Sequence, residues 1–352
     1  MHSSDFNTRS SPIVTIRLFG TFSVNADGVP IQKFTTAKAR ALLAYLALNP
    51  DQPINRSVLA TLLWPDTSDQ NARDNLRNTL HRLRKTLANG TEGTVELLTA
   101  TRQAVELHGA STQIDAVEFQ HASDAVANHE HSALDECPEC LAVLEDAVTL
   151  YRGQFLTGLD IPDAEPFEEW MLLRREFFAH RVRHALAELI AAHEAGGEYG
   201  RAQRFAEQYL ALDPLHEETH RSMMRLLARQ DLPDLALLHH TALRERLQQE
   251  LGIEPDSTTA QLALDISQGT YAASASVKPI GGASATAERI GAINWGDAPQ
   301  VAAVYGREQE IVQLSEWLTE ANHRAVAILG LGGMGKTTLA ATTARRLTDH
   351  FD

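Results

Sequence analysis

Between residues 71 and 87, leucines recur with the spacing of one helix face. Leu76, Leu80, Leu83 and Leu87 follow one another at intervals of four, three and four residues, so they form a single apolar stripe. The remaining positions are rich in cations and amides. The polar residues suited to contacts with DNA are Arg73, Arg77, Asn78, His81, Arg82 and Lys85. The pattern predicts an amphipathic helix whose polar side is either simply solvated or in contact with base edges and phosphates.

Shorter periodic segments on both sides of the basic helix favour the second interpretation. Residues 13–24 alternate and are rich in β-branched side chains, with a turn at Gly20, which predicts strands. Asn55 is suited to begin one helix, and Ser68 or Asp69 to begin the next. The predicted elements are strands over 13–24 and 29–34, helices over 36–48, 56–64 and 71–87, and a hairpin of 95–98 with 104–107. This order predicts a winged helix-turn-helix domain over residues 13–110, whose third helix enters the major groove.

Three further basic residues lie where this fold could bring them to DNA. Arg102 falls near the tip of the predicted hairpin, the wing, and is a candidate phosphate contact. Lys38 and Arg40, near the start of the first helix, are further candidates for phosphate contacts or are plain surface charges.

The chain from residue 111 to residue 270 is predicted to be helical. Apolar residues recur with helical spacing over 114–129, 141–151, 166–193, 199–212, 217–230 and 235–251. The order of Gly197, Ala202, Leu210, Asp213 and Pro214 matches a tetratricopeptide-like unit, in which a helix pair of about 34 residues buries its apolar face by stacking on the next pair. An ordinary helical bundle is the alternative.

One local cluster combines residue types that bind metals. His129 and His131 are followed within a short distance by Cys137 and Cys140, the two cysteines of the chain. Two imidazoles and two thiolates can close a tetrahedral Zn²⁺ site. The alternatives are a reduced pair of structural cysteines or a CPxC helix start packed into the fold, because a single CxxC lacks the usual paired spacing.

A glycine-rich segment near the C-terminus has the pattern of a phosphate-binding loop. RAVAIL (324–329) predicts a buried strand, GLGGMGKT (330–337) matches GxxxxGK[ST], and a helix can follow. In such loops amides surround the phosphates, the lysine reaches the β- and γ-phosphates, and the threonine hydroxyl binds Mg²⁺. The candidate nucleotide-binding residues are Gly330, Gly332, Gly333, Gly335, Lys336, Thr337 and Thr338. We expect ATP or ADP with Mg²⁺ to bind in a longer protein, because the sequence ends before a Walker-B acid.

Charge is distributed unevenly along the 352 residues. The net charge of −15 argues against a nucleic-acid partner, but residues 1–110 carry 12 Lys and Arg against 9 Asp and Glu, a net of +3. The rest of the chain therefore carries −18, and it is the local charge that governs binding to a polyanion. The polar N-terminus, predicted to be disordered over 1–12, lacks the apolar run of a signal peptide. With no apolar stretch long enough for a membrane span, we expect a cytoplasmic protein without a membrane partner.

Two stretches resemble the domains of a known family. FTTAKARALLAYLALNPDQPINRSVLATLLWPDTSDQNARDNLRNTLHRLRKTL resembles the OmpR-type winged helix of SARP transcriptional activators, the AfsR-like group. YRGQFLTG, FEEWMLLRRE and ELGIEP resemble the family's bacterial transcriptional activator domain, so the resemblance covers roughly residues 13–270. It implies tetratricopeptide-like helices, a homodimer on DNA, and a loop, Trp64–Asp69, that faces RNA polymerase. Asp66 and Asp69 would then contact the polymerase, besides forming the turn and capping the helix.

The C-terminal segment resembles a second family. VYGREQEIVQLSEWL and GLGGMGKTTLA are similar to the start of NB-ARC or STAND nucleotide-binding domains. The resemblance implies that a nucleotide module regulates the other two domains.

The sequence thus predicts a multidomain, mainly α protein. An α+β winged helix (13–110) precedes an all-α tetratricopeptide-like domain (111–270), an Ala/Gly/Ser-rich linker (271–301) and the start of an α/β P-loop domain (302–352). The predicted function is transcriptional activation, not enzymatic catalysis, with double-stranded DNA and RNA polymerase as partners. The alternative is a P-loop ATPase signalling switch whose N-terminal domains bind proteins; a pure tetratricopeptide-like scaffold would leave the basic helix unexplained.

Overall fold

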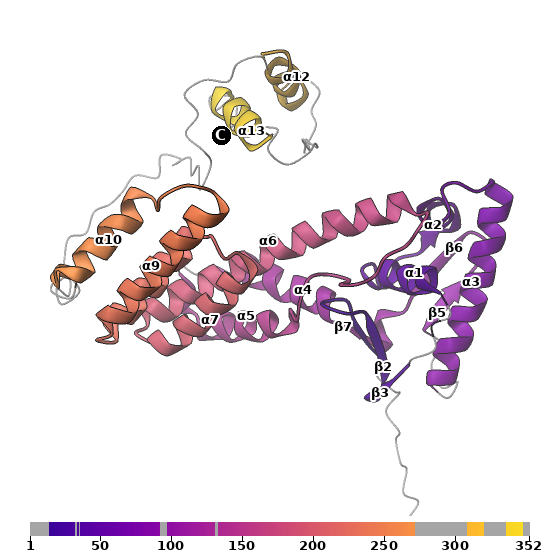
Figure 1. Ribbon diagram of the computed structural model, residues 1–352. Coiled ribbons are helices and arrows are strands. Elements are labelled where there is room, and N and C mark those ends of the chain that lie inside the picture. Colours follow the sequence, from indigo (N-terminus) through magenta and orange to yellow (C-terminus); the bar gives the residue numbers. More distant parts are fainter. Residues whose placement is uncertain are drawn as a thin grey trace, which may run out of the picture. The chain divides into compact units, whose positions relative to one another are not determined.

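The computed structural model (Figure 1) describes residues 14–31, 34, 36–91, 97–130, 133–271, 308–319 and 336–347. The chain divides into two compact units, Met1–Lys278 and Pro279–Asp352. The predicted disordered segment 1–12, the predicted strand 324–329 and nearly all of the predicted linker 271–301 lie outside the described residues. Among the described residues, no helix is long and apolar enough to cross a membrane.

A four-stranded sheet opens the first unit. Its strands are β1 (Val14–Arg17), β2 (Ser23–Ala26), β3 (Val29–Pro30) and β7 (Thr112–Ile114), in the order β3-β2-β1-β7. β1 pairs antiparallel with β2 and parallel with β7. The strands predicted around Gly20 are confirmed, and this glycine has a φ of +78°, which other residues rarely adopt. β7 is missing from the prediction because three residues carry too little alternation to identify a strand.

Three helices follow the first hairpins of the chain. They are α1 (Ala37–Ala47), α2 (Arg56–Leu63) and α3 (Asp69–Gly90), so all three predicted helices are confirmed. Each of the two longer ones begins with a side-chain cap, since the Thr36 hydroxyl accepts from Ala39 N and the Ser68 hydroxyl from Asn71 N. Asn55 occupies the cap position of α2 but makes no side-chain cap bond there.

The predicted wing is also present. β5 (Leu98–Ala100) and β6 (Ala104–Leu107) form an antiparallel hairpin, and the two-residue strand β4 (Ile54–Asn55) pairs with the other edge of β6. Because β4 directly precedes α2, the wing is hydrogen-bonded to the start of a core helix. β4 was not predicted, again because it is too short to show a pattern.

Seven helices follow in the described part of the first unit (Figure 1). They are α4 (Asp115–Asn128), α5 (Pro138–Leu150), α6 (Glu165–Ala195), α7 (Tyr199–Leu212), α8 (Glu217–Arg229), α9 (Pro233–Glu250) and α10 (Ser257–Ser267). The six predicted helices match these within a few residues, and α10 is additional. The predicted fold class, a winged helix followed by an all-α domain, is therefore confirmed.

Successive helices of this domain pack against one another. α4 contacts α5, α6 contacts α7, α7 contacts α8, and α8 contacts α9. The turn between α6 and α7 contains Gly197, whose φ of +76° lets the amide of Glu198 reach the carbonyl of His193 at 2.9 Å. Ala202, one turn into α7, is fully buried, so a small residue is what lets the two helices approach there.

In the second unit, the structure describes two helices. α12 (Glu308–Thr319) and α13 (Lys336–Arg346) contact each other through a small apolar cluster of Ile311, Leu314 and Leu339. The helix predicted after the phosphate-binding loop is thereby confirmed.

The winged helix and the helical domain share one apolar core. Phe19, directly after β1, lies at their junction, and its ring centroid is 5.8 Å from that of Phe119 in α4 and 5.1 Å from that of Phe178 in α6. Tyr151 contacts the same ring at 4.9 Å, and the Phe19 backbone forms a β-bridge with Phe155. Edge-to-face ring contacts of this kind add to the stabilisation from burial.

A buried carboxylate joins the same two parts. Asp115 begins α4 and is only 5% exposed. Its Oδ1 accepts hydrogen bonds from Leu18 N and Ala116 N, both at 2.8 Å, and its Oδ2 accepts from Phe19 N at 3.1 Å. Burial raises the pKa of Asp115 to about 6, although these three amides act in the opposite direction.

We predict that Asp115→Ala lowers the free energy of unfolding by about 2–4 kcal/mol, because buried amides at Leu18 and Phe19 lose their acceptor. The measurement is chemical denaturation followed by circular dichroism. Glu118→Ala, at an exposed position of the same helix, is the control and should change stability by less than about 0.5 kcal/mol. Equal effects of the two substitutions would contradict the role assigned to Asp115.

Candidate DNA-binding surface

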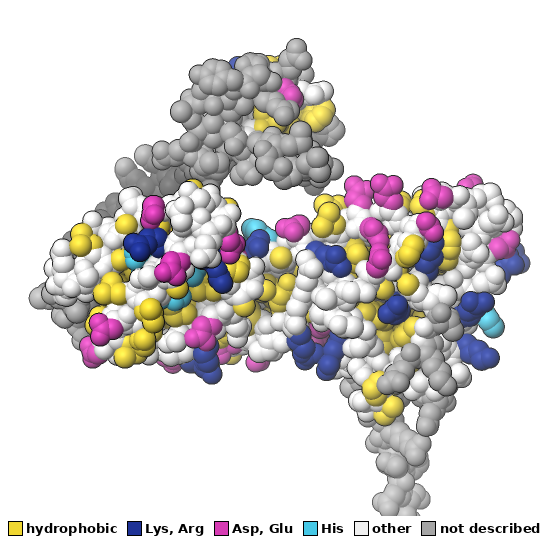
Figure 2. Space-filling model, in the orientation of Figure 1, with side chains coloured by type: hydrophobic (Ala, Val, Ile, Leu, Met, Phe, Trp, Pro, Cys, Tyr) yellow, Lys and Arg dark blue, Asp and Glu magenta, His cyan; other side chains and the backbone are white. Residues whose placement is uncertain are grey.

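The leucine stripe of α3 fixes which side of this helix faces outward. Leu76, Leu80, Leu83 and Leu87 are 1–3% exposed and belong to the apolar core. The opposite side is open. The predicted DNA-contact residues of α3 are all exposed: Arg73, Arg77, Asn78, His81, Arg82 and Lys85. Figure 2 shows basic side chains, in dark blue, along the outward side of α3.

The cations on this side remain available to a ligand. Arg77 forms an ion pair with Asp74 at 3.5 Å, but the two side chains are 71% and 43% exposed. An ion pair this exposed contributes little to stability, so a phosphate can replace Asp74 as the partner of Arg77 at small cost.

Arg84 fastens the helix to the wing. Its Nε and Nη2 atoms donate to the carbonyl oxygen of Leu98 in β5, at 3.2 and 2.8 Å. These two hydrogen bonds to one carbonyl hold the hairpin close to α3. In the sequence, Arg84 is one of several arginines flanking the leucines, and nothing in the pattern distinguishes its positioning role.

The wing ends in a turn organised by one hydroxyl. Thr101 Oγ1 accepts from the amides of Gln103 and Ala104, at 3.2 and 3.0 Å, and its hydroxyl also lies 3.2 Å from the Ala104 carbonyl. Arg102 lies between these residues, at the tip, with an exposed side chain. The sequence placed Arg102 correctly at the end of the hairpin.

Lys38 lies beside the loop between α2 and α3. Its ammonium is 5.4 Å from the ring centroid of the nearly buried Trp64, which begins that loop. Burial lowers the pKa of Lys38, an effect that the carboxylates of Asp163 and Asp66 oppose. This placement associates Lys38 with the loop more than with the outward side of α3. Arg40 lies half-buried in α1.

The loop itself presents acidic groups. Asp66 and Asp69 are exposed, and Thr67 closes the turn because its hydroxyl donates to the Trp64 carbonyl at 3.1 Å. Asp69 also occupies the first turn of α3, where a negative charge is favourable. The loop therefore combines a buried aromatic anchor with outward carboxylates.

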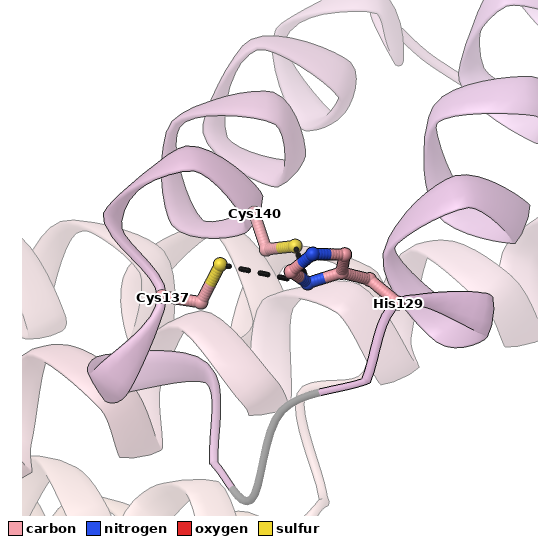
Figure 3. Close-up of side chains that lie close together, drawn as sticks. All are labelled: His129, Cys137 and Cys140. Carbon is pink, nitrogen blue, oxygen red and sulfur yellow. Dashed lines mark hydrogen bonds between the residues drawn. The ribbon is translucent and has the colours of Figure 1, made fainter.

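Three of the four predicted metal ligands come together (Figure 3). Cys140 Sγ and Cys137 Sγ lie 3.2 and 3.7 Å from His129 Nδ1. Burial, followed by the hydrogen bond with Cys137, raises the pKa of Cys140. His131 lies outside the described residues.

Most of the predicted nucleotide-binding residues lie outside the part of the chain that the structure describes. These are Gly330, Gly332, Gly333 and Gly335. Lys336, Thr337 and Thr338 form the first turn of α13, and their side chains are not among those described.

Comparison with known proteins matches the two domains of the first unit. Residues 33–103 match the profile of the family "Transcriptional regulatory protein, C terminal", and residues 114–267 match that of the "Bacterial transcriptional activator domain". The chain therefore combines an OmpR-type regulatory domain with a bacterial transcriptional activator domain and is homologous to the SARP regulators AfsR and EmbR. The two matched segments coincide with the wing-bearing domain and with the stacked helices seen here.

Similar proteins are themselves regulators. The chain is 27% identical over 327 residues to the regulatory protein AfsR of Streptomyces coelicolor, covering 89% of this chain and 30% of AfsR. It is 26% identical over 249 residues to the transcriptional regulatory protein EmbR of Mycobacterium tuberculosis, covering 70% of this chain and 61% of EmbR. The chain thus spans less than two thirds of either relative.

A solved structure has the same fold. EmbR of Mycobacterium tuberculosis, in complex with a low-affinity phosphopeptide, matches with a TM-score of 0.53 at 21% identity, covering 74% of this chain and 65% of that one. At this identity the likeness shows a shared fold and says nothing of individual site residues.

We predict that Arg84→Ala lowers the free energy of unfolding by about 1–2 kcal/mol, because the Leu98 carbonyl loses two charge-assisted donors. Arg82→Ala is the matched control, since Arg82 is an exposed arginine two residues away, and its effect should stay below about 0.5 kcal/mol. Thermal and urea unfolding would measure both. If the two variants were equally stable, the Arg84 contact would not hold the wing.

Proposed function

We propose that this chain binds promoter DNA with the outward side of α3 and activates transcription through the loop before it. The observation that supports this most is the two-sided character of α3, in which a buried leucine stripe presents arginines, amides and an imidazole outward beside a wing. In this fold the third helix enters the major groove while the wing touches the neighbouring backbone. Arg and Asn side chains are the common readers of guanine and adenine edges there.

Affinity for DNA would come mainly from phosphates. Arg73, Lys85 and Arg102 are exposed cations on α3 and the wing, whereas the chain as a whole carries −15. The acidic remainder repels DNA, which favours the face that carries α3 as the one that meets it. Binding should therefore weaken steeply as salt rises.

The loop between α2 and α3 is the proposed contact with RNA polymerase. Its carboxylates, Asp66 and Asp69, point to solvent while Trp64 and Lys38 hold its base against the core. Because the loop precedes the DNA-binding helix, a polymerase at the promoter could reach it while α3 stays in the groove. Two copies on adjacent half-sites would place two such loops on the DNA.

We predict that Arg77→Ala combined with Lys85→Ala weakens binding of a promoter fragment by at least about tenfold and lowers the slope of log affinity against log salt by about 2. Titration by fluorescence anisotropy measures both and also reports how many chains bind per site. Arg204→Ala, an exposed arginine of α7, is the control and should leave affinity unchanged. Unchanged affinity of the double variant, with folding intact, would disprove the role of α3.

Measuring DNA affinity together with transcript yield distinguishes the role of the loop from that of α3. Asp66→Ala should bind the promoter as tightly as the wild type but yield less transcript with purified RNA polymerase. Asp146→Ala, at an exposed position of α5, should leave both unchanged. A loss of DNA affinity in Asp66→Ala, or undiminished transcription, would contradict the polymerase contact.

The nucleotide-binding module is a further part of the proposal. Its support is the GLGGMGKT motif together with the finding that α13 begins at Lys336, where a P-loop helix should start. In the full-length protein we expect ATP with Mg²⁺ to change promoter affinity, and Lys336→Ala to remove this response, in filter-binding assays with labelled DNA. ATP hydrolysis without any promoter binding would instead favour a signalling ATPase whose N-terminal domains bind proteins.

A further inference from the structure

A histidine and two cysteines from two different helix ends converge on one point of the helical domain (Figure 3). Their ligand atoms, His129 Nδ1 and the sulfurs of Cys137 and Cys140, all lie within 4.8 Å of one another. Neither the DNA-binding surface nor the polymerase loop uses these residues. The cluster therefore requires its own explanation.

Hydrogen bonding alone accounts poorly for the convergence. A neutral imidazole nitrogen that accepts has a single lone pair, so it can accept from one thiol at a time. Here both sulfurs approach the same atom, Nδ1, at 3.2 and 3.7 Å. Thiols are also weak hydrogen-bond donors. A cation shared by all three atoms explains why both sulfurs face one nitrogen.

The distances fit a tetrahedral metal ion. With Zn–S bonds of about 2.3 Å and Zn–N bonds of about 2.0–2.1 Å at tetrahedral angles, nitrogen and sulfur ligands should be about 3.5 Å apart. The two observed separations lie on either side of that value. Sulfur and imidazole nitrogen are the donors that Zn²⁺ prefers.

The ends of two successive helices bring these ligands together. Cys137 is the N-cap of α5 and Cys140 lies in its first turn, so the two sulfurs come to the same side of the helix start. Cys137 makes no side-chain cap bond that would occupy its sulfur, and Pro138 fixes the first helical position. His129 is the C-cap of α4, at the other end of the connecting loop.

The three side chains differ in their exposure to solvent. Cys140 is 7% exposed, Cys137 is half-buried, and His129 is exposed. An ion can thus enter from solvent on the histidine side and come to rest against a sulfur that water barely reaches. The described residues supply three protein ligands, which leaves a fourth position for water.

We propose that His129, Cys137 and Cys140 form a Zn²⁺ site that clamps the end of α4 to the start of α5. The thiols bind as thiolates and release their protons to solvent. α4 packs on β1 and β7 of the four-stranded sheet, whereas α5 packs on α6. The ion therefore links α4, which packs on that sheet, to α5 and the helices that follow it.

The test uses the whole chain, because its two cysteines are both in the site and a thiol count reads the site directly. Protein loaded with ZnCl₂ and desalted should hold one zinc per chain by mass spectrometry. Its thiols should resist a thiol reagent until a chelator is added, after which two should react. Co²⁺ in place of Zn²⁺ should give a thiolate-to-cobalt charge-transfer band. The apparent melting temperature should fall when the ion is removed.

Variants assign the ligands. Cys137→Ser combined with Cys140→Ser should abolish binding, and His129→Ala should weaken it at least about 100-fold, more than the loss of a group outside the coordination shell. His121→Ala, an exposed histidine of α4, is the matched control and should bind like the wild type. Circular dichroism checks that each variant folds. If the double cysteine variant does not fold, the cobalt spectrum of His129→Ala still shows whether the histidine is a ligand.

Three outcomes would overturn the proposal. The first is zinc-free protein whose two thiols react at the same rate with and without added ZnCl₂. The second is a stable disulfide between Cys137 and Cys140 in protein purified without reductant, with no metal taken up after reduction. The third is unchanged affinity in His129→Ala, which would remove the histidine from the coordination sphere.

Discussion

The contact of the Phe19 ring with the helical domain is the interaction on which the rest of the first unit depends. Phe19 follows the first strand of the winged-helix domain, yet its neighbours, Phe119, Tyr151 and Phe178, all belong to the domain that follows. Asp115 reinforces the junction by accepting from the amides of Leu18 and Phe19. Because one apolar core spans both domains, the orientation of α3 is fixed relative to the stacked helices. A change in the packing of the helical domain can thus reach the DNA-binding surface.

The charges on two neighbouring surfaces, the outward side of α3 and the loop before it, favour different kinds of partner. The outward side of α3 concentrates arginines in a chain with a net charge of −15, so attraction to a polyanion is local and directional. The preceding loop presents carboxylates instead. Opposite charges a few residues apart suit the proposed function, in which DNA and a protein partner are held at the same time. The buried leucine stripe fixes the rotation of α3 about its own axis and thereby determines which of its side chains face outward.

Much of this could be predicted from sequence because long amphipathic helices carry a strong periodic signal. The leucine stripe of α3, the hairpin with Arg102 at its tip and six of the later helices were all predicted from periodicity and turn residues. The missed elements β4 and β7 have two and three residues, which is too short for any period. The contact of Arg84 with Leu98, and the position of Lys38 beside Trp64, could not be predicted because only the tertiary fold brings these partners near. From the sequence, Lys38 was a candidate phosphate contact or a surface charge. The spacing of His129 and the two cysteines predicts that they could meet. The distances between their ligand atoms follow from the packing of α4 on α5, which the sequence does not give.

The proposed function depends most on the exposed side of α3, which would read DNA sequence in the major groove. Selection of bound sites from random DNA, followed by methylation interference at guanine N7, tests it most directly, because N7 lies in the major groove. We expect an enriched motif in which methylation of particular guanines blocks binding of the wild-type chain, with the block relieved at one position in Arg77→Ala. Recovery of random sequence, or interference confined to minor-groove positions, would contradict it.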